Sequence, residues 1–329
     1  MALQKRKFVI DPGSKYLSIY GDALMYRQPN VAVIRRGRTT EVLAYGDEAM
    51  AMRTLPEHSV LVRPVSQGVV RQPDVLGAVL RKIFEKLIPV TLFKAVELYV
   101  PVPSGLGMVE RENVEKAVSG GGYKDITLIE SVLSFLPRTD GGETMIANFG
   151  AGVTDMGIIN SDGIVTACTV DIAGDAVDEK IKNVLLQNKN FKIDSAAAER
   201  VKCAIASLYT VDTSSVSVIG QDILDLRSKN FEITATQIAP AIHYCYSRIM
   251  DILETLMTSL PRQKQDEVRM NGLYIAGGGA LMNGLTDYLQ RGLHIPVYTD
   301  MDPETAVLRY TAKLISDPKY SKLLKPAGK

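Results

Sequence analysis

Short apolar runs separated by small glycine turns are the clearest hydrophobic pattern in this chain. Residues 145–149 and 156–159 are two such runs, and Gly150-Ala-Gly152 lies between them. This arrangement predicts a strand, a tight turn and a second strand. Glycine lets a ligand approach the backbone closely, so successive N–H groups in the turn could converge on an anion. An ordinary hairpin produces the same pattern, because Gly-x-Gly is a common turn between strands.

A second copy of this pattern lies at the N-terminus, in Phe8-Val-Ile-Asp-Pro-Gly-Ser-Lys-Tyr-Leu-Ser-Ile-Tyr20. Its turn carries Asp11, Gly13, Ser14 and Lys15. Two glycine hairpins that face each other could hold a polyphosphate from both sides. The carboxylate of Asp11, at the end of the first strand, could hold a hydrated Mg²⁺.

A third glycine cluster, Gly277-Gly-Gly279, follows the apolar run 273–276 and precedes a predicted helix. Three glycine turns of this type in one chain are more specific than a single glycine motif. Apolar residues at three- and four-residue steps predict further helices. These segments are 75–87, 108–119, 195–207, 236–260 and 303–315. A chain of 329 residues is long for one domain and comfortable for two.

The composition is ordinary for a folded cytosolic protein and excludes some classes. The net charge is +1, so no global electrostatic attraction to nucleic acid is expected. The cysteines Cys168, Cys203 and Cys245 are far apart, which predicts reduced, packed thiols. There is no run of 18 apolar residues that could span a membrane, and the basic N-terminus lacks the apolar core of a signal peptide. A cytoplasmic location is therefore expected.

The glycine clusters and the segments between them resemble the actin and heat-shock-chaperone ATPase superfamily, and within it the MreB-like bacterial actins. Tyr45-Gly-Asp-Glu-Ala-Met-Ala-Met52 is similar to the family's VGEEAKEM, and Arg63-Pro-Val-Ser-Gln-Gly-Val-Val70 to its RPLKDGVI. Other segments follow in family order over nearly the whole chain: 100–105, 129–130, the central hairpin, 171–175, 198–202, 276–279 and 302–307.

This resemblance implies an actin-like ATPase fold, with two related α/β domains and a nucleotide cleft between them. Domain I would comprise residues 1–142 and 308–329, and domain II residues 143–307. The family implies an ATP-binding cytoskeletal protein that polymerises into nucleotide-dependent filaments, in cell shape or intracellular organisation. Its cofactors would be ATP or ADP and Mg²⁺. Its partners would be further copies of itself, the inner face of the cell membrane, and cell-shape or wall-synthesis proteins.

The resemblance assigns the phosphate contacts to both hairpin turns and to the turn before the helix that starts near 175. These residues are Asp11, Gly13, Ser14, Lys15, Gly150, Ala151, Gly152, Val153, Thr154 and Gly174, with Asp11 also holding Mg²⁺ through water. It assigns the adenosine to Gly277, Gly278 and Gly279, together with Glu199 and Lys202. A surface ion pair is the alternative interpretation of Glu199 and Lys202.

Two residues are candidates for ATP hydrolysis. The segment 129–136 is close to actin's IQAVLSLY, which places Glu130 where a glutamine orients the attacking water. A carboxylate there can orient water and accept its proton, whereas a glutamate favoured by a helix dipole is the alternative.

The family's second hairpin begins with an aspartate, but this chain has Asn148. An amide removes one negative charge beside Mg²⁺ and cannot act as a base, which predicts slow hydrolysis with binding retained. Lys15 adds a positive charge that could offset some of the lost metal affinity.

Apolar residues continue from the predicted helix 75–87 into the segment 88–94, a connection that would normally be polar. Within it, Thr91-Leu-Phe-Lys94 resembles a short membrane-insertion loop of the family, which assigns membrane contact to Leu92 and Phe93. Burial of two such side chains offers only ~3–6 kcal/mol. One protomer would therefore bind lipid weakly and a filament firmly. Packing of these side chains on the sheet is the alternative.

Two other functions stay open from the sequence. A small-molecule kinase of the same fold would need a substrate-binding insertion and a carboxylate for the acceptor hydroxyl, for which 329 residues leave little room. A nucleotide-binding scaffold with little hydrolysis agrees with Asn148.

Overall fold

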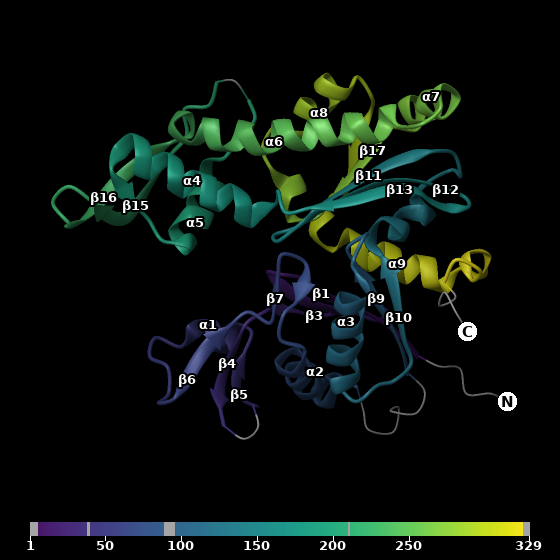
Figure 1. Ribbon diagram of the computed structural model, residues 1–329, viewed down its shortest axis with the longest axis horizontal. Coiled ribbons are helices and arrows are strands. Elements are labelled where there is room, and N and C mark those ends of the chain that lie inside the picture. The colour runs from purple at the N-terminus through teal and green to yellow at the C-terminus, as the bar shows by residue number, and fades with distance from the viewer. Residues whose placement is uncertain (1–5, 38–39, 89–95, 210, 325–329) are drawn as a thin grey trace. The chain divides into compact units, whose positions relative to one another are not determined.

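The computed structural model describes residues 6–37, 40–88, 96–209 and 211–324, and the chain divides into two compact units. Unit 1 comprises Met1–Asp140, Ser161–Ile164 and Thr305–Lys329, and unit 2 comprises Gly141–Asn160 and Val165–Glu304. Each unit has its own apolar core and its own five-stranded sheet (Figure 1). Each therefore has the properties of a domain.

The sheet of unit 1 has the strand order β10-β9-β1-β2-β3. Its strands are β1 (Arg6–Pro12), β2 (Tyr16–Tyr20), β3 (Leu24–Pro29), β9 (Val96–Val102) and β10 (Ile126–Glu130). β1, β2 and β3 form an antiparallel meander, whereas β9 runs parallel to β1 and β10 parallel to β9. The glycine turn 13–15 therefore joins the central strand to its antiparallel neighbour, as the sequence predicts.

Helices cover both faces of this sheet (Figure 1). α2 (Pro73–Leu87) and α3 (Met108–Gly120) pack on the face that carries Phe8 and Ile10. Neighbouring side chains in a strand point to opposite faces. Lys7 accordingly faces the other side, where its Nζ donates to the carbonyl of Ile315 in α9 (Ala306–Ser316) at 2.6 Å.

The remaining described elements of unit 1 are short. They are the sheet of β5 (Thr40–Tyr45), β4 (Ala32–Arg36) and β6 (Ser59–Val62), helix α1 (Asp47–Ala51), strands β7 (Val65–Ser66) and β8 (Val69–Val70), and 3₁₀ helices η2 (Ser131–Arg138) and η5 (Pro318–Tyr320). The helix that the sequence places at Glu130 is thus a 3₁₀ helix, and Glu130 itself is the last residue of β10.

The sheet of unit 2 repeats this topology, with the order β13-β12-β11-β17-β18. Its strands are β11 (Thr144–Phe149), β12 (Thr154–Asn160), β13 (Gly163–Val170), β17 (Leu273–Ala276) and β18 (Val297–Thr299). β11 pairs antiparallel with β12 and parallel with β17, just as β1 pairs with β2 and β9. The turn 150–153 therefore occupies the same place in unit 2 as the turn 13–15 in unit 1. The predicted second copy is confirmed as a structural repeat.

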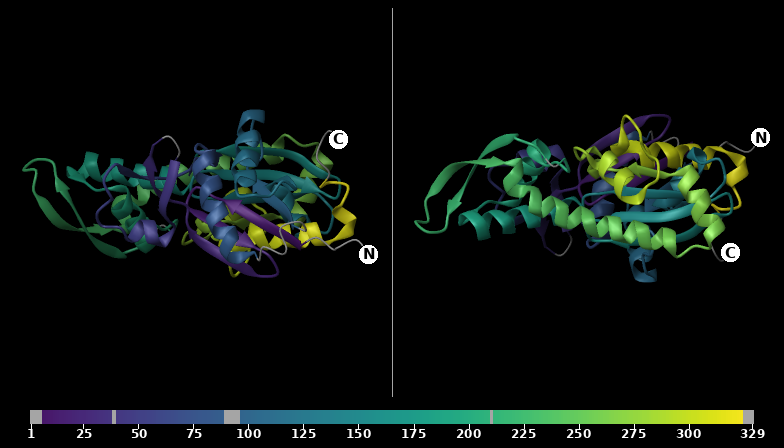
Figure 2. Two further views of the ribbon diagram at one scale, coloured as in Figure 1. Left: turned by 90° about the horizontal axis from the view of Figure 1, so that it is seen from below. Right: turned by 90° about the horizontal axis from the view of Figure 1, so that it is seen from above.

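The helices of unit 2 are α4 (Gly174–Lys189), α5 (Ser195–Ile205), α6 (Ala235–Thr258), α7 (Arg262–Asn271) and α8 (Leu285–Leu293), with 3₁₀ helices η3 (Gly278–Leu281) and η4 (Pro303–Thr305). α6 runs along the unit and packs against α4 and β12 (Figure 2). A small sheet adds β14 (Phe191–Lys192), β15 (Ser215–Asp222) and β16 (Ser228–Thr234). The helix predicted over 236–260 ends at Thr258, and α7 follows it unpredicted, because α7 is mostly polar and buries only Val268.

The buried carboxylate of Glu143, the residue before β11, holds the polar helix α7 in place. Glu143 is 5% exposed and accepts hydrogen bonds from Nζ of Lys264 at 2.5 Å and Nδ2 of Asn160 at 3.1 Å. Nδ2 of Asn271 donates to the carbonyl of Glu143 at 2.9 Å. The bond from Lys264 is the main reason that the pKa of Glu143 is lowered to about 2. Polar contacts with Glu143 therefore hold α7 against the unit in place of apolar packing.

Within the segment 88–94, residues 89–94 lie outside the described residues, and with them the predicted membrane contacts Leu92 and Phe93. Ile88, the first residue of that segment, is 1% exposed and belongs to the core of unit 1. Of the helices in the described part of the chain, none combines the length and apolar character needed to cross a bilayer.

The cysteines follow the sequence prediction only in part. All three are free thiols; Cys245 is buried and Cys168 is half-buried. Cys203 is exposed on α5, so the prediction of a packed thiol is wrong for this residue. Its neighbours Val201 and Ile205 face the core, which turns Cys203 toward solvent.

Candidate functional site

The glycine turn of unit 1 is held in shape by two neighbouring segments. Nδ2 of the buried residue Asn30 donates to the carbonyl of Gly13 at 2.8 Å. The amide of Gly68, in the turn between β7 and β8, donates to Oγ of Ser14 at 3.0 Å. A Cβ on Gly13 would lie 2.9 Å from the carbonyl oxygen of Tyr16, so the turn requires glycine. The backbone of this turn is therefore fixed before any anion reaches it.

Asp11 lies in β1 at the base of this turn. Burial raises the pKa of its carboxyl to about 6, although the positive charge of Arg27 acts in the opposite direction. A cation beside Asp11 would favour its ionised form. Nowhere in the described ranges do three or more His, Cys, Asp or Glu side chains gather as a metal cluster. Mg²⁺ commonly binds to one or two carboxylates together with waters and phosphates, so the chemistry of Asp11 fits the predicted role.

The glycine turn of unit 2 rests on the first turn of α4. The amide of Gly150 donates to the carbonyl of Val153 at 3.0 Å and closes the turn. The amides of Gly174 and Asp175 donate to the carbonyls of Gly150 and Ala151 at 3.1 and 2.8 Å. These bonds use the Gly174 amide inside the unit, and its contact with a phosphate stays a prediction.

The remaining residues of this turn have different degrees of burial. Gly152 is buried, whereas Ala151 and Val153 are half-buried. Thr154 is fully buried, and its Oγ1 donates to the carbonyl of Ile172 at 2.7 Å. Its hydroxyl therefore anchors β12, while the backbone amides of 151–153 are the better candidates for an anion.

Asn148 lies directly opposite Asp155 in the β11–β12 ladder. Paired residues in an antiparallel ladder point to the same face of the sheet. Asp155 is 2% exposed, and its Oδ1 accepts a hydrogen bond from Oγ1 of Thr169 at 2.6 Å. This carboxylate was not predicted from the sequence. The signal was present, since residues 148 and 155 are equally far from the centre of the turn.

The third glycine cluster packs against the second turn. Gly277 has φ +82°, and a Cβ there would lie 2.3 Å from the carbonyl oxygen of Phe149 and 2.7 Å from Oδ1 of Asn148. Packing within the unit therefore requires glycine at 277. Gly278 differs, because the nearest atom to a Cβ there is Oε1 of Glu304 at 3.5 Å. Packing therefore requires glycine at 277, whereas the exposed Gly278 could accept a Cβ without a clash.

Lys202 contacts the start of α4 in unit 2. Its Nζ donates to the carbonyl of Gly174 at 2.9 Å and to Oδ2 of Asp178 at 2.8 Å. The side chains of Lys202 and Asp178 are only 15% and 10% exposed, so this is a largely buried ion pair. Glu199 is half-buried on the same helix as Lys202. The adenosine contacts of both residues stay predictions.

The carboxylate of Glu130, at the end of β10, is paired with Arg111 of α3. Nη2 of Arg111 donates to Oε1 of Glu130 at 2.8 Å, and Nε donates to the carbonyl of Leu106 at 3.1 Å. The guanidinium thus fixes the direction of the Glu130 carboxylate. Arg111 was not predicted, because it is one of several charged residues on the helix predicted over 108–119.

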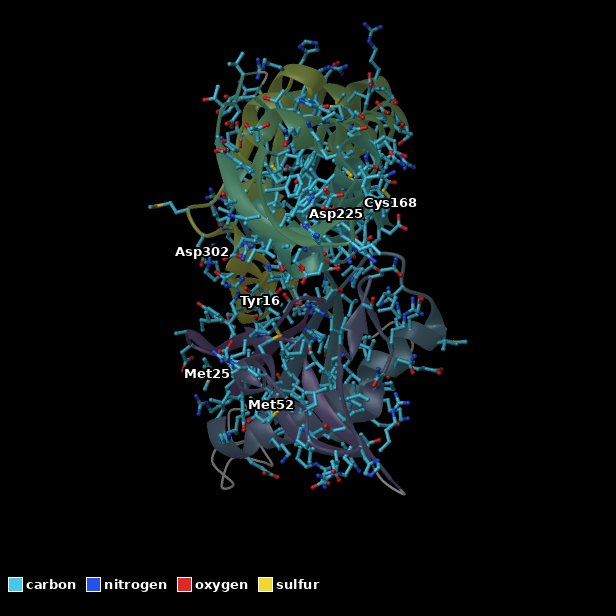
Figure 3. The ribbon with its side chains drawn as sticks, turned by 90° about the vertical axis from the view of Figure 1, so that its left-hand side faces the viewer. Tyr16, Met25, Met52, Cys168, Asp225 and Asp302 are labelled. Carbon is cyan, nitrogen blue, oxygen red and sulfur yellow. The ribbon has the colours of Figure 1, made fainter. Side chains whose placement is uncertain are left out.

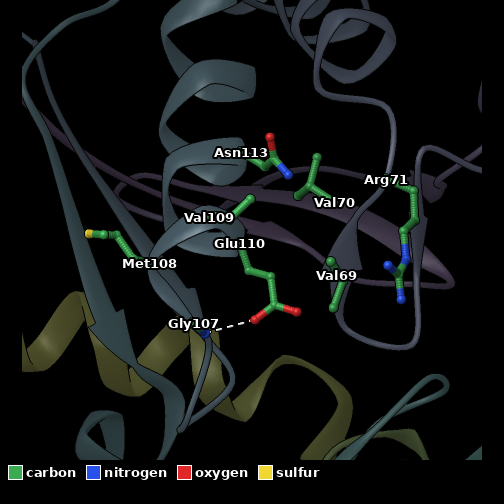
Figure 4. A pocket seen from close by; sticks show the side chains of 8 residues that line it. All are labelled: Val69, Val70, Arg71, Gly107, Met108, Val109, Glu110 and Asn113. Carbon is green, nitrogen blue, oxygen red and sulfur yellow. Dashed lines mark hydrogen bonds between the residues drawn. The ribbon is translucent and has the colours of Figure 1, made fainter.

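A cavity of about 450 Å³ lies in unit 1 between β8 and the first turn of α3 (Figure 4). It is lined by Val69, Val70, Arg71, Gly107, Met108, Val109, Glu110 and Asn113. The Glu110 carboxylate accepts a hydrogen bond from the Gly107 amide at 2.7 Å and caps α3. The predicted site residues do not line this cavity.

Two α/β units with one shared topology, each with a glycine turn after its first strand, define an actin-like fold. The structure matches MreB5 of Spiroplasma citri bound to AMPPNP with a TM-score of 0.86 at 22% identity, over 97% of this chain and 98% of that one. The chain belongs to the MreB/Mbl protein family, whose family model matches residues 5–322.

Further relatives agree with this membership. The cell shape-determining protein MreB of Escherichia coli strain K12 is 28% identical, over 93% of this chain and 92% of that protein. The cell shape-determining protein Mbl of Bacillus subtilis strain 168 is 25% identical, over 95% and 96%. The MamK double helical filament has the same fold, with a TM-score of 0.78 at 19% identity, over 94% of this chain and 99% of that one. The predicted family and fold class are confirmed.

Proposed function

We propose that this chain is an ATP-binding cytoskeletal protein that assembles into nucleotide-dependent filaments, in cell shape or intracellular organisation. The observation that carries the proposal is the glycine turn repeated at one place in both units of an MreB/Mbl family chain. The relatives support it. MreB5 of Spiroplasma citri was solved with AMPPNP and with ADP, and MamK as a filament. The Escherichia coli relative is a cell shape-determining protein.

Each unit contributes its glycine turn to phosphate binding in this proposal. The amides of 13–15 and of 151–153 donate to phosphate oxygens, and Asp11 holds Mg²⁺ through water. The metal, when bound, neutralises part of the phosphate charge. The open side of Gly278 receives the adenosine, with Glu199 and Lys202 as further contacts. The packing around Gly13 supports the proposal because it fixes the shape of the first turn without a ligand.

Hydrolysis is proposed to be slow and coupled to filament dynamics. Glu130, oriented by Arg111, positions the attacking water and accepts its proton. Asn148 can donate and accept hydrogen bonds but cannot accept a proton as a carboxylate does. Bound ATP would therefore be hydrolysed slowly.

The filament is further proposed to lie at the inner face of the cell membrane. Leu92 and Phe93 would contact lipid, and cell-shape or wall-synthesis proteins would be partners. The apolar character of this connection in the sequence supports the membrane contact. A small-molecule kinase is not favoured, because the relatives that match 93% and 95% of this chain are cell shape-determining proteins.

Titration of the purified chain with ATP in a calorimeter tests this function. Gly278→Asp should abolish ATP binding, because a charged side chain there would occupy the space proposed for the adenosine. The variant should still fold, since a Cβ at 278 meets no atom closer than 3.5 Å. Gly278→Asn adds a side chain of nearly the same shape as aspartate but without its charge. It therefore separates the effect of the charge on ATP binding from the effect of side-chain size.

The outcomes are distinct. Wild-type affinity in a folded Gly278→Asp protein would remove the third glycine cluster from the site. Failure of the wild-type chain to bind ATP would overturn the proposed function.

A further inference from the structure

Arg27 lies in line with Asp11 across three strands of unit 1. Asp11 pairs with Ser18 in the β1–β2 ladder, and Ser18 pairs with Arg27 in the β2–β3 ladder. Directly paired residues in antiparallel strands point to the same face. Asp11, Ser18 and Arg27 therefore form a row on one face of the sheet, below the glycine turn.

Tyr16 holds the guanidinium of Arg27 beside this turn. Tyr16 is the first residue of β2, directly after the turn (labelled in Figure 3). The Cζ atom of Arg27 lies 4.3 Å from the centroid of the Tyr16 ring, and Nζ of Lys15 lies 5.5 Å from the same centroid. A cation over the face of an aromatic ring is attracted by the ring's electrons. Two cations therefore gather around one ring at the mouth of the turn.

The positive charge of Arg27 acts on the carboxyl of Asp11, at the base of the turn. Guanidinium groups also suit phosphate oxygens, because they offer paired N–H donors in a fixed plane and stay charged. Arg27 thus has the position and the chemistry of a phosphate ligand.

We propose that Arg27, held against Tyr16, binds the phosphates of the nucleotide at the first glycine turn and lets this chain keep part of its nucleotide affinity without a divalent cation. The proposal rests on the ATP binding proposed above. It adds a residue to the site and a property, binding with reduced dependence on Mg²⁺. Lys15 adds to the same effect at a greater distance from the ring.

Equilibrium titration with ATP, in Mg²⁺ and separately in EDTA, tests the proposal. The wild-type chain should bind ATP in both buffers. Arg27→Gln should weaken binding in EDTA about tenfold or more, because one charge-assisted hydrogen bond to a phosphate is lost. The loss should be smaller in Mg²⁺, where the metal supplies positive charge. Arg36→Gln, which removes an exposed arginine at the end of β4, is the matched control and should change neither value.

Further variants separate charge from geometry. Arg27→Lys should recover part of the affinity in EDTA, because it keeps the charge but loses the planar donor pair. Tyr16→Leu should weaken binding in EDTA, whereas Tyr16→Phe should not, since phenylalanine keeps the ring face. Thermal melts establish that each variant is folded, and the Tyr16 pair tests the proposal even if Arg27→Gln does not fold.

Three outcomes would contradict the inference. They are wild-type affinity of Arg27→Gln in EDTA, complete loss of wild-type binding in EDTA, and equal affinities of Tyr16→Leu and Tyr16→Phe. A wild-type chain that binds no ATP in either buffer would instead overturn the proposed function.

Discussion

Arg111 and Glu130 form an ion pair between α3 and β10, with Nη2 of Arg111 2.8 Å from Oε1 of Glu130. The side chains are 33% and 28% exposed, so water reaches both. The bond from Arg111 to the carbonyl of Leu106 keeps the guanidinium in place. The carboxylate proposed to orient the attacking water is therefore itself oriented by a residue on a different element.

Loss of this ion pair should slow ATP hydrolysis without weakening ATP binding. Arg111→Met keeps the apolar stem and removes the guanidinium, so the Glu130 carboxylate is free to rotate. We expect the rate of phosphate release at saturating ATP to fall about tenfold, or ~1.4 kcal/mol of barrier. Glu130→Ala should lower the rate further. Lys116→Met on the same helix, which removes an exposed ion pair with Asp74, is the control. Equal rates for Arg111→Met and Lys116→Met would contradict this role.

Replacing the amide of Asn148 by a carboxyl should raise the rate of hydrolysis. Asn148→Asp restores a group that can act as a base, and the gain should be on the order of tenfold. The new carboxyl would lie opposite the buried carboxylate of Asp155. Two carboxylates held close together raise the pKa of one of them, because both cannot easily be ionised.

The rate of Asn148→Asp should therefore rise with pH as the new carboxyl ionises, and rise further than that of wild type. Phosphate release measured from pH 5 to pH 9 checks this expectation. A rate equal to wild type at every pH, with ATP still bound, would show that Asn148 does not limit hydrolysis.

The Glu143–Lys264 pair should make the stability of unit 2 depend on pH in acid. The folded-state pKa of Glu143 is about 2 and the ordinary value is 4.5. Its stabilising contribution is thus fully present above about pH 4.5 and is lost as the pH falls toward 2. Lys264→Met should destabilise the chain by ~2 kcal/mol at pH 7. The carboxylate of Glu143 stays buried in this variant but no longer accepts a hydrogen bond from the charged Lys264.

Urea unfolding at pH 7 and at pH 3 measures this difference. The gap between wild type and Lys264→Met should shrink at pH 3, where Glu143 contributes less. Arg262→Met, at the exposed start of α7, is the control. A gap that is the same at both pH values would contradict the assignment to Glu143.

The membrane prediction separates lipid contact from packing. Leu92→Ser combined with Phe93→Ser should melt within a few degrees of wild type and still assemble with ATP. It should lose co-sedimentation with anionic liposomes, because each protomer loses ~3–6 kcal/mol of apolar contact. Ile88→Ser is the contrasting variant, since Ile88 is 1% exposed and its loss should cost about 3–5 kcal/mol of stability. Unchanged liposome binding by the double variant would refute the lipid contact.

The sequence predicts those parts of the site that depend on local chain geometry. Gly150 and Gly13 lie between short apolar runs, and this pattern was enough to place both hairpins. The family resemblance then predicted the two-unit α/β fold. The placement of a turn residue between two strands is therefore well predicted, because it depends on residues that are close in sequence.

Contacts between distant elements could not be predicted in this way. Arg111 meets Glu130, and Lys202 meets Asp178, only because helices and strands pack in three dimensions. The row from Asp11 to Arg27 needs the register of two ladders, one of which contains an irregularity between Ile19 and Tyr20. Helix α7 was not predicted, because its sequence lacks the periodic apolar residues of an amphipathic helix and its contacts are polar.

Negative-stain electron microscopy of the purified chain tests the central claim most directly. The samples are the wild-type chain without nucleotide, with ADP and with ATP, and Gly278→Asp with ATP. We expect filaments in the wild-type sample with ATP, few or none without nucleotide, and none in the folded Gly278→Asp sample. Dispersed wild-type protein in ATP, or equally abundant filaments in all four samples, would contradict a nucleotide-dependent actin-like filament.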